Sequence, residues 1–176
     1  MNRSPMAAAA LAAFAVAAPA LAQSMSPNWY GNLGYTQTNQ GSPSGAHIGA
    51  VTGRVGARFG QHFGVEGELS GGSSGDQTRG GLNAKLQSQY AAYAVGYLPV
   101  SRNAEVFARV GYGESRMKFK GAGGYSDTSE SLNYGAGGQY FLSAKDGVRA
   151  EYTRQEAAGN LAPNADTASV SWVHRF

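Results

Sequence analysis

Apolar and polar residues alternate with a period of two through most of the chain after residue 28. The stretch 168–176 shows this clearly, because alanine, valine, tryptophan, histidine and phenylalanine occupy its even positions, and serine, valine and arginine its odd ones. Such alternation is typical of a β-strand with one apolar face. Eight segments of this kind can be delimited: 29–37, 47–59, 63–70, 83–98, 105–118, 132–142, 148–155 and 168–176.

The connections between these segments alternate between short and long. Three are short, and Pro99 ends the fourth strand because proline cannot donate to a strand ladder. Four are long and rich in Gly, Ser or other turn residues, at 39–46, 71–82, 119–130 and 157–166. This order predicts an antiparallel, up-and-down arrangement in which all the long loops lie at one end.

Periodicity does not say which face of the strands points outward. In a soluble barrel of the lipocalin type the apolar side chains fill the interior, whereas a transmembrane barrel turns them toward lipid. Strand length favours the second arrangement, and so do the many Gly and Ala residues on the polar face of the strands. Aromatic residues near the strand ends also favour it, because we expect them in an interfacial girdle. We therefore predict an all-β fold, an eight-stranded antiparallel up-and-down transmembrane β-barrel. The residues expected in the girdle are Trp29, Phe59, Phe63, Tyr97, Tyr152 and Phe176, together with His174.

The first 22 residues have the features of a secretory signal peptide. Arg3 provides the positive start, residues 6–18 are uncharged and mostly apolar, and residues 20–22 read Ala-Leu-Ala. We predict a cleaved signal peptide at 1–22 and a barrel domain at 23–176. The apolar run is too short for a membrane-spanning helix.

Composition removes several classes of function. The chain has no Cys, which excludes disulfides, thiolate metal sites and cysteine nucleophiles. A net charge of +3 is too small to indicate nucleic acid binding. The sequence points to no cofactor and no metal site.

A set of charged and polar residues lies on the strand face opposite the apolar face, so we expect these residues inside the barrel. Buried charges must be paired, which favours a network that fills the lumen. The alternative is a narrow pore lined by arginines, although eight strands enclose little more than their own side chains. The candidates are Arg54, Arg58, Glu66, Glu68, Arg109, Gln139, Arg149, Glu151 and Arg175.

We predict that the protein is not an enzyme. Small barrels that deacylate lipid A use a His and a Ser two positions apart on one strand face. None of His47, His62 and His174 has a Ser at this spacing.

The residues from 23 onward resemble the OmpA/OmpX class of eight-stranded outer-membrane barrels. The resemblance rests on residues 137–140 (Gly-Gly-Gln-Tyr), residues 148–152 (Val-Arg-Ala-Glu-Tyr) and a final strand that ends in Phe176. His174 departs from the pattern, because these families usually have Tyr or another hydrophobic residue there. The resemblance implies a stand-alone, monomeric barrel in the outer membrane of a Gram-negative cell, without the cell-wall-binding domain of OmpA.

The resemblance also implies partners and a role. The final strand would pair with the first, and its residues Val170, Trp172 and Phe176 would be the signal read by the barrel-insertion machinery. The barrel would contact membrane lipid. Apart from the resemblance, the distinctive groups of the outer loops are Arg79, Lys118, Lys120 and Tyr125, whose basic members could contact lipopolysaccharide phosphates. The alternative is that these loops are simply solvated. We expect a structural or surface-interaction role through the four loops. The alternative is a narrow channel for small solutes or hydrophobic molecules, as in the OmpW type.

Overall fold

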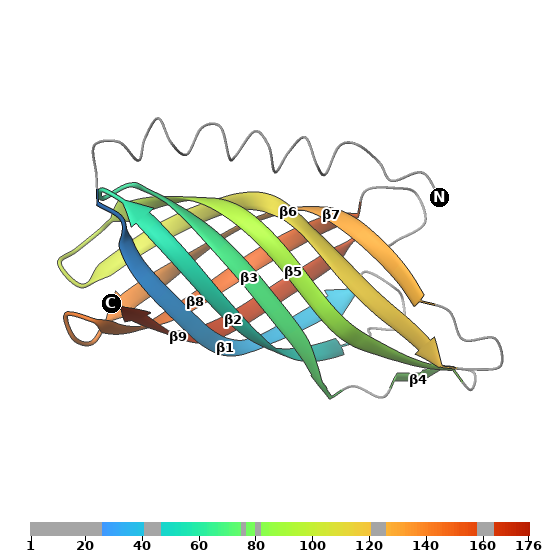
Figure 1. Ribbon diagram of the computed structural model, residues 1–176. Helices are drawn as coiled ribbons and strands as arrows, with labels where there is room; N and C mark the ends of the chain where they lie inside the picture. The colour runs from blue at the N-terminus through green and yellow to red at the C-terminus, as the bar shows by residue number, and fades with distance from the viewer. Residues whose placement is uncertain (1–25, 41–46, 75–76, 80–81, 121–125, 158–163) are drawn as a thin grey trace.

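The computed structural model describes residues 26–40, 47–74, 77–79, 82–120, 126–157 and 164–176. These residues form one antiparallel sheet (Figure 1). Its strands are β1 (Asn28–Gln40), β2 (His47–Phe59), β3 (Phe63–Ser74), β4 (Gln77–Arg79), β5 (Leu82–Pro99), β6 (Ala104–Lys120), β7 (Ser126–Phe141), β8 (Asp146–Ala157) and β9 (Ala165–Arg175). In the part of the chain that the structure describes, no helix is long and apolar enough to cross a bilayer.

Eight long strands close into a barrel. Each pairs with its neighbour in sequence, β3 pairs with β5, and β9 returns to pair with β1, where Tyr30 lies opposite Arg175. The Phe176 amide extends this pairing by donating to the Trp29 carbonyl oxygen at 3.0 Å. The three-residue β4 pairs only with the first residues of β5. The predicted eight-stranded fold is therefore confirmed.

The two ends of the barrel differ. At one end, here named the turn end, the strands are joined by the short connections 60–62, 100–103 and 142–145, and β1 begins beside the end of β9. Gly60, with a φ of 66°, occupies the left-handed region that the β2–β3 turn requires. The opposite end, the loop end, carries the longer connections (Figure 1).

Several strands extend further toward the loop end than the sequence indicates. β3 continues to Ser74, and β7 begins at Ser126, so the predicted loop at 119–130 is wrong for residues 126–130. The polar residues there show no apolar alternation, but backbone pairing with β6 continues as far as Lys118 opposite Ser126. β4 likewise lies within the predicted loop at 71–82.

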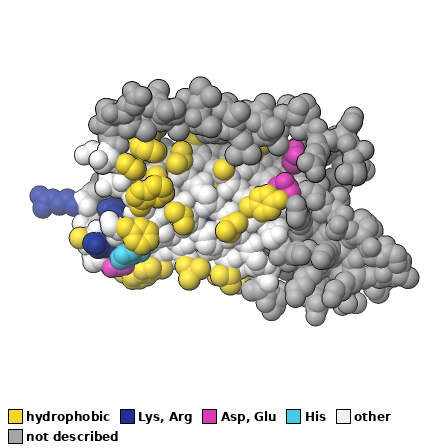
Figure 2. Space-filling view, viewed as in Figure 1, with side chains coloured by type: hydrophobic (Ala, Val, Ile, Leu, Met, Phe, Trp, Pro, Cys, Tyr) yellow, Lys and Arg dark blue, Asp and Glu magenta, His cyan; other side chains and the backbone are white. Residues whose placement is uncertain are grey.

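The distribution of side chains is inverted relative to a soluble barrel. Large apolar residues cover the outside, where Leu69 and Val170 are 68% and 65% exposed, whereas Arg149 inside is 1% exposed. Figure 2 shows apolar side chains spread over the visible outer wall. This pattern suits a barrel surrounded by lipid and rules out the lipocalin-type arrangement.

One predicted girdle residue is on the wrong side of the wall. Tyr97 is 4% exposed and points into the lumen with Tyr93 and Val95 of the same strand. The outer face of β5 carries small residues instead, such as Ala92 and Ala94. Residues 86–99 of this strand carry no charge on either face, so alternation alone did not distinguish inside from outside. Of the other expected girdle residues, Trp29, Phe63, Tyr152 and Phe176 are exposed, whereas Phe59 and His174 are intermediate.

Candidate functional site in the barrel lumen

All the residues predicted for the lumen point inward, and they separate into two groups. The central cluster comprises Arg54, Glu66, Glu68, Arg109, Arg149 and Glu151. The turn-end cluster comprises Arg58, Glu105, Gln139 and Arg175.

The central cluster is a continuous set of ion pairs between three arginines and three glutamates. Arg54 reaches Glu68 at 2.7 Å and Glu151 at 2.6 Å. Arg109 lies 2.9 Å from Glu68 and 2.7 Å from Glu151. Arg149 joins Glu66 at 2.5 Å to Glu151 at 2.9 Å. Every one of these side chains is at most 6% exposed, so the six charges cancel inside the wall.

Aromatic residues support the central cluster, and the sequence reading missed them. The Tyr30 hydroxyl donates to Glu66 at 2.7 Å and lies 2.6 Å from the Tyr97 hydroxyl. The Arg149 guanidinium lies 3.9 Å from the centroid of the Phe107 ring, a cation–π arrangement. Phe107 has the same strand parity as Arg109 and Tyr30 the same parity as Asn32, a signal that could have placed both inside.

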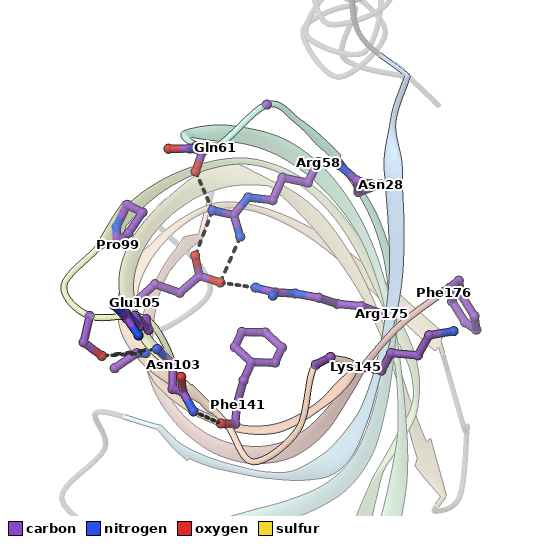
Figure 3. Close-up of a pocket in the computed structure, with 15 residues that line it drawn as sticks. Asn28, Arg58, Gln61, Pro99, Asn103, Glu105, Phe141, Lys145, Arg175 and Phe176 are labelled. Carbon is purple, nitrogen blue, oxygen red and sulfur yellow. Dashed lines mark hydrogen bonds and ion pairs between the residues drawn. The ribbon is translucent and has the colours of Figure 1, made fainter.

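The turn-end cluster is held together by Glu105, which the sequence reading also missed. Its Oε1 accepts from Arg58 and Arg175, both at 2.8 Å, and from the Gln139 amide (Figure 3). Arg175 also lies over the Phe141 ring, 3.4 Å from its centroid. Glu105 has the parity of Arg109, so strand alternation could have found it. With Glu105 included, the two clusters contain five arginines and four glutamates, a surplus of one positive charge.

Toward the loop end the lumen is lined by hydroxyl groups. Thr52 Oγ1 lies 2.7 Å from Thr36 Oγ1 and 2.8 Å from Ser70 Oγ. At the level of the central cluster, Asn32 has two buried side-chain atoms without a hydrogen-bond partner, and Arg54 Nη1 and Ser171 Oγ have none either. Asn32 lies opposite Arg54 on β2 and Val173 on β9, so these polar atoms share one side of the lumen.

The predicted insertion signal lies on the outer face of β9 and just beyond it. Val170, Trp172 and Phe176 are exposed, the last by 75%. His174 does not simply join the girdle, because its Nδ1 lies 2.7 Å from Asp146 Oδ1 and its ring meets Phe176 edge to face at 5.3 Å.

His174, Asp146 and Ser143 form a group that superficially suggests hydrolysis. The Ser143 hydroxyl, however, donates to Asp146 Oδ2 at 3.3 Å. In a catalytic triad the serine must bond to the histidine, which takes its proton. The arrangement therefore orders the turn before β8 and does not activate a nucleophile. His62 is exposed, and the side chains of His47, Arg79, Lys118, Lys120 and Tyr125 lie outside the described set. Within the described residues, no three potential ligands gather into a metal site.

A family model described as "Outer membrane protein beta-barrel domain" matches residues 7–176. The chain belongs to this family. Its location is accordingly the cell outer membrane, as the sequence predicted. A search of curated protein sequences finds no match.

Solved outer-membrane barrels share the fold of this family member. Ail, the attachment invasion locus protein of Yersinia pestis, in complex with the heparin analogue sucrose octasulfate, has a TM-score of 0.66 at 18% identity, covering 86% of this chain and all of that one. The N-terminal β-barrel domain of Pseudomonas aeruginosa OprF gives 0.64 at 9% identity with the same coverage. Neisserial surface protein A gives 0.61 at 16% identity, covering 84% of this chain and 95% of that one. At these identities the likeness concerns the fold.

Proposed function

We propose that this outer-membrane barrel has a structural or surface-interaction role and does not act as an open channel. The observation that carries the proposal is the central cluster, whose six charged side chains fill the lumen and are paired with one another. An eight-stranded barrel has an interior only wide enough for side chains. Any interaction with other molecules is therefore assigned to the exposed ends and not to a passage.

The proposal fixes an orientation. In outer-membrane barrels the short turns face the periplasm and the longer loops face outward. We place the turn end, with Trp29 and Phe176, in the periplasm, and assign contact with lipopolysaccharide and other surface partners to the loops. In a Gram-negative cell, the signal peptide at 1–22 would direct export, and Val170, Trp172 and Phe176 would form the signal for insertion into the outer membrane. The inserted protein would remain a monomer without enzymatic activity.

The second candidate is a narrow channel for small solutes. It is favoured by the unpartnered Asn32, Arg54 Nη1 and Ser171 Oγ and by the hydroxyl chain above them, since buried polar atoms of this kind are usually hydrated. Toward the turn end, a small, mostly apolar pocket of about 30 Å³ borders Gln139, whose Oε1 also lacks a partner. The central cluster lies between the hydroxyl chain and this pocket.

Conductance in planar bilayers distinguishes the two. The purified barrel is expected to give no reproducible open state across a range of voltages. The Glu66→Gln variant, which weakens the barrier, serves as a comparison. Discrete openings in the wild-type protein that recur between preparations would favour the channel.

A further inference from the structure

The periplasmic mouth of the barrel is a vestibule with an excess of positive charge. It has a volume of about 580 Å³, within the range of small-molecule sites. Its floor is formed by Glu105, Phe141 and the guanidinium groups of Arg58 and Arg175 (Figure 3). Arg102 and Lys145, on the turns that follow β5 and β7, complete the charged part of the lining.

The vestibule is lined by more positively charged than negatively charged side chains. Four cationic side chains line it, and among the described lining residues Glu105 is the one acidic side chain. This carboxylate already accepts from both Arg58 and Arg175, so two guanidinium groups share a single anion. The exposed Arg102 and Lys145 form no side-chain hydrogen bond or ion pair with another described residue.

Phosphate fits this arrangement better than a single carboxylate. A phosphate monoester carries a charge of about −1.5 to −2 at neutral pH and presents three acceptor oxygens. Guanidinium forks bind such oxygens in pairs, and an ammonium group adds a point charge. With the terminal carboxylate of Phe176 counted beside Glu105, four cations against two carboxylates leave a net charge of +2, which a ligand with two negative charges would balance.

We propose that the vestibule binds a phosphate monoester, with Arg102 and Lys145 at the rim as its main ligands and Arg175 below them. Arg58 and Glu105 form the floor, and Glu105 keeps both guanidinium groups in the mouth and prevents them from turning toward the solvent. The ester is either a free periplasmic solute or the headgroup of phosphatidic acid in the adjacent leaflet. This site is separate from the loops and from the central cluster.

The test measures binding of two probes to the refolded full-length barrel domain. Glycerol 3-phosphate is titrated by calorimetry in a zwitterionic detergent free of phosphate, with glycerol as the neutral control. Phosphatidic acid is presented in phosphatidylcholine nanodiscs, and the side-chain ¹⁵N resonances of arginine and lysine are followed. Binding in the first arm indicates a free ester, and binding in the second arm alone indicates the lipid headgroup.

The variant Arg102→Gln/Lys145→Gln decides whether the vestibule is responsible. Both residues are exposed, so we expect normal folding, checked by the shift of the heated protein on electrophoresis. Affinity should fall about tenfold or more because two charge-assisted contacts are lost. The control Arg154→Gln removes a cation at the loop end and should bind as the wild type does. Equal affinity of the double variant and the wild type would overturn the proposal. The proposal would also be overturned if neither probe bound at about 10 mM, because a dissociation constant above this concentration is too weak for a specific site.

Discussion

Arg149 of β8 and Glu66 of β3 are 83 positions apart in sequence, yet their side chains meet at 2.5 Å with no exposed area on either. The contact crosses the lumen between strands that are not neighbours. It therefore joins opposite parts of the wall, which backbone pairing cannot do.

Glu66→Ala is expected to destabilise the barrel strongly. Arg149 would keep its ion pair with Glu151, but the central cluster would hold three arginines against two glutamates. An uncompensated buried charge of this kind costs about 3–5 kcal/mol. Urea titration in phospholipid vesicles, followed by tryptophan fluorescence, measures the loss. The exposed pair of Arg154 and Asp166 provides the control, because Asp166→Ala should cost about 1 kcal/mol or less. Equal losses in the two variants would contradict the view that the central cluster holds the wall together.

Glu66→Leu combined with Arg149→Met is expected to restore much of what the single change removes. With both charges gone, no uncompensated guanidinium group remains between β8 and β3. The same titration should give a loss for the double variant that is smaller than the sum of the two single losses. Additive losses would show that the two residues act independently.

Glu105→Gln should destabilise the turn end by about 2 kcal/mol, since its hydrogen bonds to charged groups are weakened while neutral ones remain possible. The change leaves Arg58 and Arg175 without their carboxylate. Hydrogen exchange resolves the effect, which we expect as lower amide protection near the β5–β6 and β7–β8 turns. Unchanged protection there would show that Glu105 does not organise this end.

Two glycines provide a matched test of the packing inside and outside the wall. A Cβ at Gly137 would lie 2.4 Å from the Ala150 carbonyl oxygen and 2.6 Å from the Phe107 ring, whereas nothing lies within 4 Å of one at Gly53. Gly137→Ala is expected to lower stability by about 1–3 kcal/mol through overpacking. Gly53→Ala should be neutral or slightly stabilising, because alanine loses less backbone entropy than glycine. Reversed effects would mean that the assigned inner and outer faces are wrong.

Phe176→Ser should slow assembly while leaving the folded barrel stable. Phe176 is largely exposed, so the substitution removes little packing, but it changes the proposed insertion signal. Pulse labelling of cells, with folded and unfolded forms separated by electrophoresis, gives the rate of assembly. Leu142→Ser, an exposed change at the same end, is the control and should assemble at the wild-type rate. Identical rates for both variants would remove Phe176 from the signal.

The sequence was sufficient to predict the fold and all six charged residues of the central cluster. The central parts of β2 and β8 carry charged residues on one face only. A charged face cannot lie in lipid, which placed Arg54 and Arg149 inside. β5 has no charge in its central part, and there the orientation of Tyr97 depends on which neighbours need its hydroxyl and its bulk. That information lies in β1 and β3, where Tyr30 and Glu66 are found.

Residues near strand ends were harder to assign for a different reason. Glu105 is the second residue of β6, so its place on the inner face can be inferred only from the alternation that follows it, up to Arg109. The start of β7 at Ser126 depends on backbone pairing with β6, which polar side chains do not indicate. Pairing between strands depends on residues that are distant in sequence. A local sequence pattern predicts a strand only where one face of that strand must be apolar.

The hydrogen bond from the Phe176 amide to the Trp29 carbonyl has a consequence for how the protein is made. It joins the first membrane strand to the last, so the sheet cannot close until synthesis and export of the whole chain are finished. Until then both edges expose unpaired backbone groups, which hydrocarbon does not tolerate. The polypeptide must therefore be kept unfolded and away from lipid while it crosses the periplasm, and a chain shortened by one strand at either end would have no stable membrane form.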